Sequence, residues 1–275
     1  KAEAAAMPNG RFGHGLPPVS DGQMLFLTHL AQKMRPAHEG GGRAGIVLNG
    51  SPLFNGAAGS GPSEIRRWLL ESDLVEAIVA LPTNMFFNTG IATYIWILDN
   101  TKTDERKGKV QLIDATSFWT KLRKNLGAKG REVGADDRDR ILALYDAFEE
   151  NDHSKIFDNT DFGYWTITVE RPLRNEAGEF VTDKKGNPKP DTKLRDTENV
   201  PFTYEGGIEA FFEKEVKPFA PDAWIDEKQT KIGYEISFTK YFYKPIQLRS
   251  LEEITADLRA LEAETKGLLD EIIGG

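Results

Sequence analysis

The sequence predicts an α/β fold, and three short apolar segments joined by helical or turn-forming sequence lead to that prediction. Residues 44–48, 74–81 and 92–98 are runs of mainly aliphatic and β-branched residues, and each has the length of a strand. Continuous apolar runs of this kind are typical of strands that are covered on both faces. Because a helix-patterned segment connects the first run to the second, we expect a sheet packed between helices.

A helix is predicted before the first strand, over residues 20–35. Its apolar positions follow the spacing of one buried helical stripe, with Leu27, Leu30, Ala31 and Met34. Ser20 and Gln23 have the spacing of a capping box, and Pro36 ends the pattern.

A second helix is expected between the first two strands, with Ser63 as its N-cap. Its buried face is expected to carry Ile65, Trp68 and Leu69. Further along the chain, residues 110–113 predict a fourth strand and residues 138–149 a third helix.

Residues 157–202 are predicted to form an inserted hairpin arm. The segment is polar, and residues 175–178 and 185–187 contain the Asn and Gly residues of tight turns.

The last 25 residues predict an amphipathic helix, and Ser250 with Glu253 forms a second candidate capping box. Its apolar residues alternate between three- and four-residue steps: Leu251, Ile254, Leu258, Leu261, Thr265, Leu268 and Ile272. That spacing favours a coiled-coil seam. A helix that folds back on its own domain explains the pattern equally well.

The composition excludes several classes of protein. The 275 residues carry a formal net charge of −8, so the chain is not a generally basic nucleic-acid coat. It has no cysteine, which excludes disulfides, thiolate metal sites and cysteine nucleophiles. No apolar run reaches the roughly 18 residues of a membrane-spanning helix, so no membrane partner is expected. We expect a cytoplasmic setting.

Motifs for metal or nucleotide chemistry are also missing from the sequence. The four histidines do not stand at metal-ligand spacing, and no metal is expected. The chain contains no Walker-type phosphate loop, no strand-linked G-x-G-x-x-G and no nucleophile elbow. Composition and general motifs therefore leave the function open.

The segment LPTNMFFNTG, residues 81–90, is the most informative loop. Phe86 and Phe87 lie in it between two predicted strands, which places two rings at the end of a sheet. Ligands of open α/β sheets bind at strand ends. The alternative is that both rings only plug the end of the sheet.

Several sequence blocks resemble one protein family. GGRAGIVL, SPLFNG and SEIRRWLLESDLVEAIVALPTNMFFNTGIATYIWIL occur in this order. Together they resemble the modification (methyltransferase) subunit of type I restriction-modification systems, an N6-adenine DNA methyltransferase family. RFGHGLPPVSDGQMLFLTHLAQKM, LIDATSFWTKLRKNLGAKGRE and GYEISFTKYFYKP extend the resemblance over nearly the whole chain.

The resemblance implies the C-terminal part of a Rossmann-like methyltransferase sheet, with S-adenosylmethionine as methyl donor and adenine in DNA as acceptor. In the family an aromatic residue before the last hairpin strand packs against the flipped base. Phe86 is the best match by its place before Gly90 and Ile91, and Phe87 is the second choice. An aromatic face restores the stacking that an extruded base loses.

Two loops that the family requires are missing from the sequence. These are the Gly-containing donor loop and the Asn/Asp-Pro-Pro-aromatic loop that holds the adenine amine. We expect them upstream of Lys1, the second within about a dozen residues. The fragment alone is expected to be inactive and to bind the donor poorly. The expected division is residues 1–115 for the catalytic domain, 116–249 for a family-specific extension and 250–275 for an assembly helix.

Basic residues supply the candidate DNA contacts. One group lies in a stretch without acids: Lys121, Arg123, Lys124, Lys129 and Arg131. A solvated linker is the alternative for this stretch. Arg171 and Arg174 lie on the predicted arm and are further candidates.

The resemblance implies a specificity subunit as partner, with the restriction subunit as a further candidate. Residues 251–275 carry seven acids and two bases, a charge of −5 that suits a helix bundle better than DNA. The competing hypothesis for the whole chain is a non-catalytic protein-interaction module that uses this terminal helix.

Overall fold

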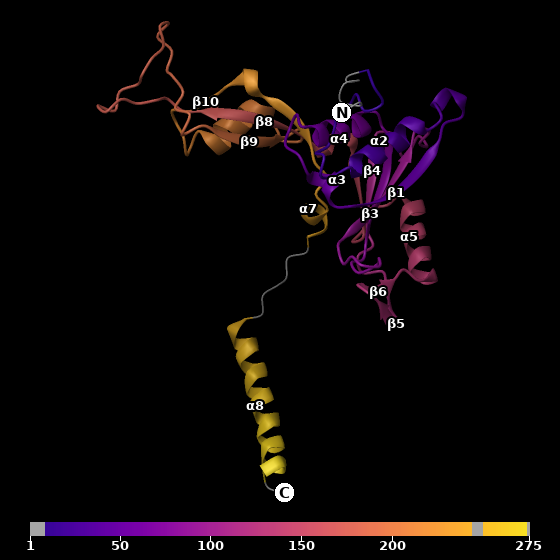
Figure 1. Ribbon diagram of the computed structural model, residues 1–275. Coiled ribbons are helices and arrows are strands. Elements are labelled where there is room, and N and C mark those ends of the chain that lie inside the picture. The colour runs from indigo at the N-terminus through magenta and orange to yellow at the C-terminus, as the bar shows by residue number, and fades with distance from the viewer. Residues whose placement is uncertain (1–8, 244–249, 274–275) are drawn as a thin grey trace. The chain divides into compact units, whose positions relative to one another are not determined.

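The computed structural model describes residues 9–243 and 250–273. The chain forms two compact units, Lys1–Phe242 and Tyr243–Gly275. All of the sheets lie in the first unit (Figure 1).

The centre of the first unit is a mixed five-stranded sheet in the order β1-β3-β2-β4-β7. Its strands are β1 (Arg43–Asn49), β2 (Val75–Leu81), β3 (Thr93–Asp99), β4 (Lys109–Asp114) and β7 (Ser154–Asp158). β3 runs antiparallel to β1 and β2, β2 runs parallel to β4, and β7 runs antiparallel to β4. The four strands predicted from apolar runs are confirmed, and so is the α/β class.

The most buried strand is β2, in which all seven residues are buried. β1 is different, because it lies at the edge of the sheet and Val47 is 47% exposed. The prediction that β1 is covered on both faces is therefore wrong for the described part of the chain. One face of β1 is exposed, because the alternate residues Arg43, Gly45 and Val47 are all exposed.

Three helices pack against one face of the sheet: α2 (Gln23–Lys33), α3 (Ser51–Phe54) and α4 (Gly61–Glu71). Leu27 and Leu69 are fully buried in this core together with Trp96 of β3. The helix α5 (Ala135–Ala147) lies over the other face, where its half-buried Ile141 and Leu144 pack against a core that includes Val79, Leu81 and Ile113. The predicted helices exist, although α5 begins three residues earlier than expected.

Two predicted N-caps are wrong. α2 begins at Gln23, and the Gln23 side chain accepts a hydrogen bond from the Asn49 backbone N–H instead of closing a capping box. α4 begins two residues before Ser63, whose buried hydroxyl accepts a hydrogen bond from the Tyr234 N–H. In both cases a contact with a distant strand uses the side chain that local sequence assigned to the cap.

A second sheet contains β8 (Gly163–Glu170), β9 (Asp196–Pro201), β10 (Trp224–Ile225) and β11 (Lys231–Tyr234). It has its own small core, in which Ile167 and Val200 pack against Phe212. α6 (Gly207–Phe211) and a π-helical turn (Phe212–Val216) cover it. The remaining short elements are α7 (Phe238–Phe242) and the 3-10 turns Ala37–Glu39, Asn159–Phe162 and Glu227–Gln229.

β8 and β9 form the stem of the predicted arm, and residues 171–195 leave the sheet between them (Figure 1). Both predicted turns are confirmed. Gly178 and Gly186 adopt positive φ angles of 80° and 85°, and the Gly178 and Gly186 N–H groups close the turns on Asn175 and Asp183.

The second unit contains the helix α8 (Leu251–Ile273). Its capping box is confirmed, because the Ser250 N–H donates to Glu253 Oε2 at 2.9 Å and the Glu253 N–H donates to Ser250 Oγ at 3.2 Å. The coiled-coil seam stays a prediction. Within the described residues no helix combines the length and the apolarity needed to cross a membrane.

Candidate nucleic-acid interface

The loop between β2 and β3 projects from the end of the sheet and contains two tight turns. We call residues 83–90 the aromatic loop. Asn84 and Asn88 adopt positive φ angles of 59° and 62°, a conformation that asparagine tolerates better than most residues. Phe86 and Thr89 pair across the second turn. The asparagines therefore fold the loop into a small finger with the two phenylalanines at its end.

Both rings are accessible to solvent. Phe86 is 39% exposed and Phe87 is 64% exposed. A side chain that only plugs a sheet end is expected to be buried, so this exposure favours the binding hypothesis over the plug hypothesis, most clearly for Phe87. An exposed aromatic pair on a structured loop has a surface available for stacking.

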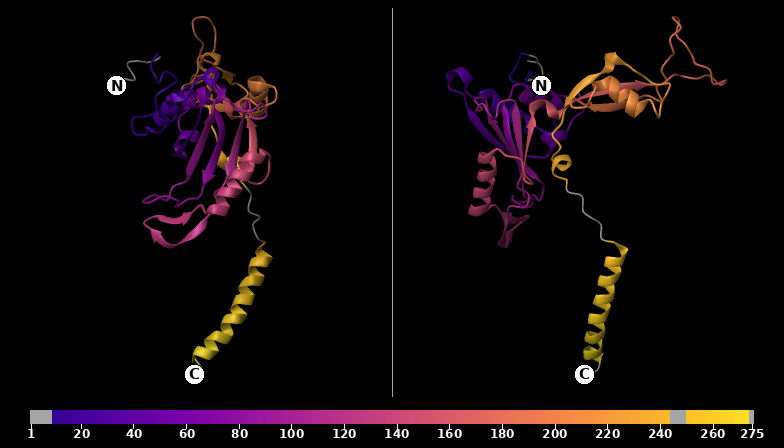
Figure 2. Two further views of the ribbon diagram at one scale, coloured as in Figure 1. Left: turned by 90° about the vertical axis from the view of Figure 1, so that its right-hand side faces the viewer. Right: turned by 180° about the vertical axis from the view of Figure 1, so that it is seen from behind.

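A short hairpin packs against the aromatic loop. We call it the basic hairpin; it consists of β5 (Thr120–Leu126) and β6 (Lys129–Glu132). The Asn84 carbonyl accepts hydrogen bonds from the Gly130 N–H at 3.1 Å and the Arg131 N–H at 3.3 Å. Arg131 Nη1 also donates to Thr83 Oγ1 at 3.2 Å. In the left view of Figure 2 the two projections lie side by side at one end of the sheet.

A second contact joins the tip of the basic hairpin to the aromatic loop. Gly127 has a φ of 62°, and a Cβ atom built on it lies 3.2 Å from both the Phe87 ring and Asn88 Oδ1. A side chain at this position therefore needs the loop to move. The glycine permits both the two-residue turn and the close approach.

The five predicted basic residues all lie on this hairpin. Lys121, Arg123 and Lys124 are exposed, whereas Lys129 and Arg131 are half-buried. The Arg131 guanidinium stacks at 4.0 Å over the Trp119 ring, so its planar face is occupied. The segment is paired as a hairpin and is not the solvated linker of the alternative prediction.

Arg171 and Arg174 lie elsewhere, at the base of the arm. Arg171 Nε contacts Asp222 Oδ1 at 2.9 Å, and Arg174 Nη2 contacts Asp222 Oδ2 at 3.1 Å. The hydrogen bond from Arg171, helped by Arg174, lowers the pKa of Asp222. Arg174 also stacks at 4.4 Å over Phe180. One carboxylate thus holds both guanidinium groups, which the sequence did not indicate.

The sequence pattern of the family "N-6 DNA Methylase" matches residues 2–163, more than half of the chain. The chain belongs to this family. The aromatic loop and the basic hairpin lie inside the matched range, whereas Arg171 and Arg174 lie outside it.

Individual relatives agree with the family match. The type I restriction enzyme MjaVII methylase subunit of Methanocaldococcus jannaschii is 32% identical over 157 residues, which cover 52% of this chain and 26% of that protein. The EcoKI methylase subunit of Escherichia coli K12 is 33% identical over 154 residues, 56% of this chain and 27% of that protein. The chain therefore spans about a quarter of the length of these curated relatives.

A solved structure is similar as well. The type I restriction-modification methyltransferase subunit of Streptococcus thermophilus superposes with a TM-score of 0.50 at 27% identity, over 59% of this chain and 32% of that chain. The mixed α/β architecture is thus shared with a methyltransferase subunit of this family.

An ionic cluster lies between α5 and the central sheet, and the sequence did not indicate it. Glu76, which is 4% exposed, accepts a hydrogen bond from Arg43 at 2.9 Å, and Arg106 lies 3.8 Å away. Burial, with Glu76 as a hydrogen-bond partner, raises the pKa of Tyr145 to about 12. Arg106 donates to the Tyr145 carbonyl. The cluster attaches α5 to β1 and β2, and its role is structural.

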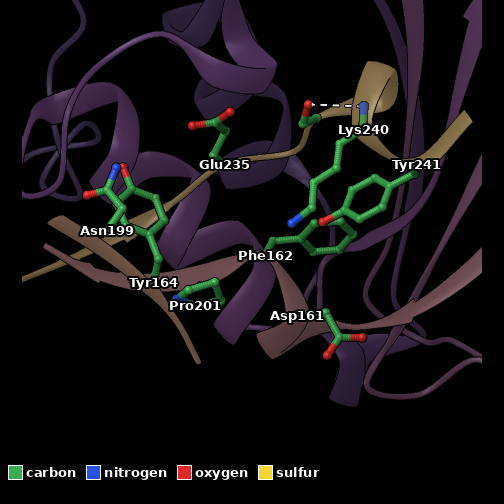
Figure 3. Close-up of a pocket in the computed structure, with 10 residues that line it drawn as sticks. Asp161, Phe162, Tyr164, Asn199, Pro201, Glu235, Lys240 and Tyr241 are labelled. Atoms are coloured by element: carbon green, nitrogen blue, oxygen red, sulfur yellow. Dashed lines mark hydrogen bonds between the residues drawn. The ribbon is translucent and has the colours of Figure 1, made fainter. Parts of the chain in front are cut away.

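A cavity of about 170 Å³ lies between β8, β9 and the segment that leads to α7 (Figure 3). Charged Asp161, Glu235 and Lys240 line it together with Tyr164 and Tyr241. Burial raises the pKa of both tyrosines. None of the predicted site residues lines this cavity, so it is separate from the interface described above.

Proposed function

We propose that this chain is the distal part of a type I restriction-modification methyltransferase that methylates N6 of adenine in DNA. The observation that carries the proposal is the exposed aromatic loop held against a basic hairpin. This arrangement offers ring faces for a base and positive charge for phosphates at one end of a sheet. The family match supports the same activity.

In this proposal Phe86 stacks on the flipped adenine, with Phe87 as second choice. Extrusion of a base costs a few kcal/mol of stacking and pairing, and a ring that receives the base recovers part of it. The pairing of Phe86 with Thr89 holds the ring at the loop end. Because stacking requires no hydrogen-bond pattern, the choice of adenine depends on other residues.

The methyl donor of the family is S-adenosylmethionine, and the described residues do not fit it. Gly50, after β1, is followed at once by Ser51 and Pro52 of α3. The adjacent cavity measures about 120 Å³ and four prolines contribute to its lining, whereas small-molecule sites usually occupy about 300–1,000 Å³. We assign no step of methyl transfer to these residues. Donor contacts belong, in this proposal, to loops that the sequence does not contain.

The open edge of β1 supports a longer, Rossmann-like sheet. Within residues 9–243 and 250–273, β1 has no strand on its outer side and Val47 is exposed, so this edge is suited to pairing with another strand. In the proposed enzyme, residues 1–115 complete the catalytic domain, 116–249 form an extension and 250–275 form an assembly helix. The fragment alone is proposed to be inactive.

DNA phosphates are proposed to contact the exposed side chains Lys121, Arg123 and Lys124. The specificity subunit is proposed to bind α8, and the restriction subunit joins the same assembly. The exposed apolar residues of α8 support this role, and Leu251, Ile254, Leu258 and Leu261 are 83%, 42%, 62% and 58% exposed. The same exposure favours the second candidate, a non-catalytic module that acts through α8 alone.

The test is Phe86→Ala in the assembled methyltransferase. We expect a large loss of DNA methylation, with the affinity for S-adenosylmethionine nearly unchanged. Phe219→Ala is the matched control, because Phe219 is 85% exposed and lies outside the aromatic loop. Wild-type turnover by the Phe86 variant would remove the stacking role. No donor binding by the wild-type assembly would favour the interaction module.

A further inference from the structure

The tip of the basic hairpin carries an apolar side chain in an unusual place. Leu126 is 53% exposed, and it pairs with Lys129 across the two-residue turn of Gly127 and Ala128. Tips of two-residue hairpins are usually polar. Because 53% of Leu126 is exposed, it is available to another molecule.

This tip does not stand alone, because it touches the aromatic loop. Gly127 approaches the Phe87 ring so closely that a Cβ atom lies 3.2 Å from it. Phe87 is itself 64% exposed. Two exposed apolar side chains, Leu126 and Phe87, thus belong to neighbouring tips that are in contact.

The two tips are also held in a fixed relationship. Hydrogen bonds from Gly130 and Arg131 to the Asn84 carbonyl join the middle of β6 to the start of the aromatic loop. The loop and the hairpin therefore meet at two points. A rigid connection of this kind lets the two tips act on a partner as one body.

The charge around the tips selects the kind of partner. The hairpin residues 120–131 contain five basic residues and no acid. An apolar point surrounded by positive charge complements double-stranded DNA, which presents phosphates outside and stacked bases inside. A protein partner with an apolar surface would account for the exposure of Leu126, but it would leave the five positive charges without partners.

We propose that Leu126 and Phe87 form a wedge that enters the DNA base stack at the position an extruded adenine has left. The inference rests on the proposed function, in which Phe86 receives that adenine. Apolar side chains inserted between base steps are a known way to hold an opened duplex. The wedge fills the vacated space, and the exposed lysines hold the flanking phosphates.

The test measures binding of the 275-residue chain to two short duplexes of equal length, with fluorescence anisotropy as the readout. One duplex is intact and the other has an abasic site at its centre, which offers a vacated position without the cost of extrusion. We expect about tenfold tighter binding of the abasic duplex. Leu126→Ala should lose this preference while keeping the salt dependence of binding, because its charges are unchanged.

Leu142→Ala is the control, since Leu142 is 56% exposed on α5 and should keep the wild-type preference. Equal binding of both duplexes by the wild-type chain would overturn the wedge. An unchanged preference in the Leu126 variant would do the same. If the chain binds neither duplex, the wedge is rejected, whereas methylation by the assembled enzyme tests the proposed function separately.

Discussion

Arg131 contacts the aromatic loop through Asn84, whose carbonyl accepts the Arg131 N–H at 3.3 Å, and the Arg131 side chain donates to the neighbouring Thr83. Its guanidinium also lies on the Trp119 ring. Arg131 was one of five predicted phosphate contacts. From these hydrogen bonds and the ring contact we propose that Arg131 acts as a positioning residue, which holds the hairpin against the loop.

The Arg131→Lys substitution keeps the positive charge but removes the planar stacking and the fork of hydrogen-bond donors. In the assembled enzyme we expect kcat to fall roughly 10–100-fold as the loop shifts. KM for DNA and the salt dependence of binding should stay near wild type. Lys124→Ala should behave in the opposite way, with its salt slope reduced by about 1 and kcat retained. If DNA binding by Arg131→Lys instead depended much less steeply on salt than wild-type binding, Arg131 would be a phosphate contact and not a positioning residue.

Gly127→Ala tests the contact between the two tips. Alanine in a left-handed conformation costs about 1–2 kcal/mol, and at this site its Cβ also meets the Phe87 ring. Gly178→Ala is a matched control, because Gly178 has a φ of 80° and nothing within 4 Å of its Cβ position. Thermal unfolding should show a loss for both variants, and the loss should be larger for Gly127→Ala because of its contact with the Phe87 ring. Only Gly127→Ala should reduce methylation. Equal activities of the two variants would mean that methylation does not depend on the contact between the hairpin tip and the aromatic loop.

Arg66 is predicted to be the most sensitive charged residue of α4. It is fully buried, and burial lowers its pKa to about 10. Its guanidinium donates to three backbone carbonyls at 3.1 Å or less, those of Tyr234, Pro52 and Asn55. Removing it leaves these acceptors unpaired in the core, so Arg66→Ala should cost roughly 3–5 kcal/mol in urea unfolding.

The neighbouring Arg67 provides the comparison. It pairs with Glu71 at 2.9 Å on the helix surface, and Arg67→Ala should cost less than about 1 kcal/mol. Similar losses for the two arginine variants would mean that the carbonyl contacts of Arg66 contribute little.

Asp222→Asn should release the two arginines at the base of the arm. In the proposed enzyme, we expect DNA affinity to rise about two- to threefold and its salt dependence to steepen. Because the folded-state pKa of Asp222 lies below the ordinary 3.8, the pairing is complete above 3.8 and is lost only as pH falls through the lowered value. Titration of Asp222 should therefore not change the DNA affinity of the wild-type protein between pH 6 and 8. An unaltered affinity in Asp222→Asn would exclude Arg171 and Arg174 from DNA binding.

Truncation before Ser250 tests the assembly role of α8. The first unit contains all of the sheets, so its thermal unfolding should be unchanged within error. Co-purification with the specificity subunit should be strongly reduced. Full assembly by the truncated chain would contradict the proposed role of α8.

The sequence predicted the central strands because apolar runs such as residues 75–81 are buried by any α/β arrangement. The turns at Gly178 and Gly186 were predictable for a similar reason, since they depend on local residues. Local reasoning failed where a distant group was the better partner. Ser63 bonds to Tyr234, 171 residues away, and no helix-capping pattern contains that information.

In the candidate site, too, the features that depend on local sequence were predictable and the contacts between distant residues were not. The sequence placed Phe86 and Phe87 at the end of a sheet, but it did not decide whether the rings plug that end or are exposed, as they are in the structure. It did not predict their contact with the basic hairpin, because Asn84 and Gly130 are far apart in the sequence and meet through backbone atoms. The only local signal was the Gly127 turn within the basic segment, which indicates a hairpin but not what it packs against.

The most direct measurement of the central claim is photocrosslinking of the assembled methyltransferase to DNA that carries 5-iodouracil at the target position. After digestion, mass spectrometry locates the attached nucleotide. We predict attachment within residues 83–90, principally at Phe86, and loss of that product in Phe86→Ala. Attachment at another site, such as the tyrosines of the cavity beside β8, would contradict the claim that the aromatic loop receives the target base.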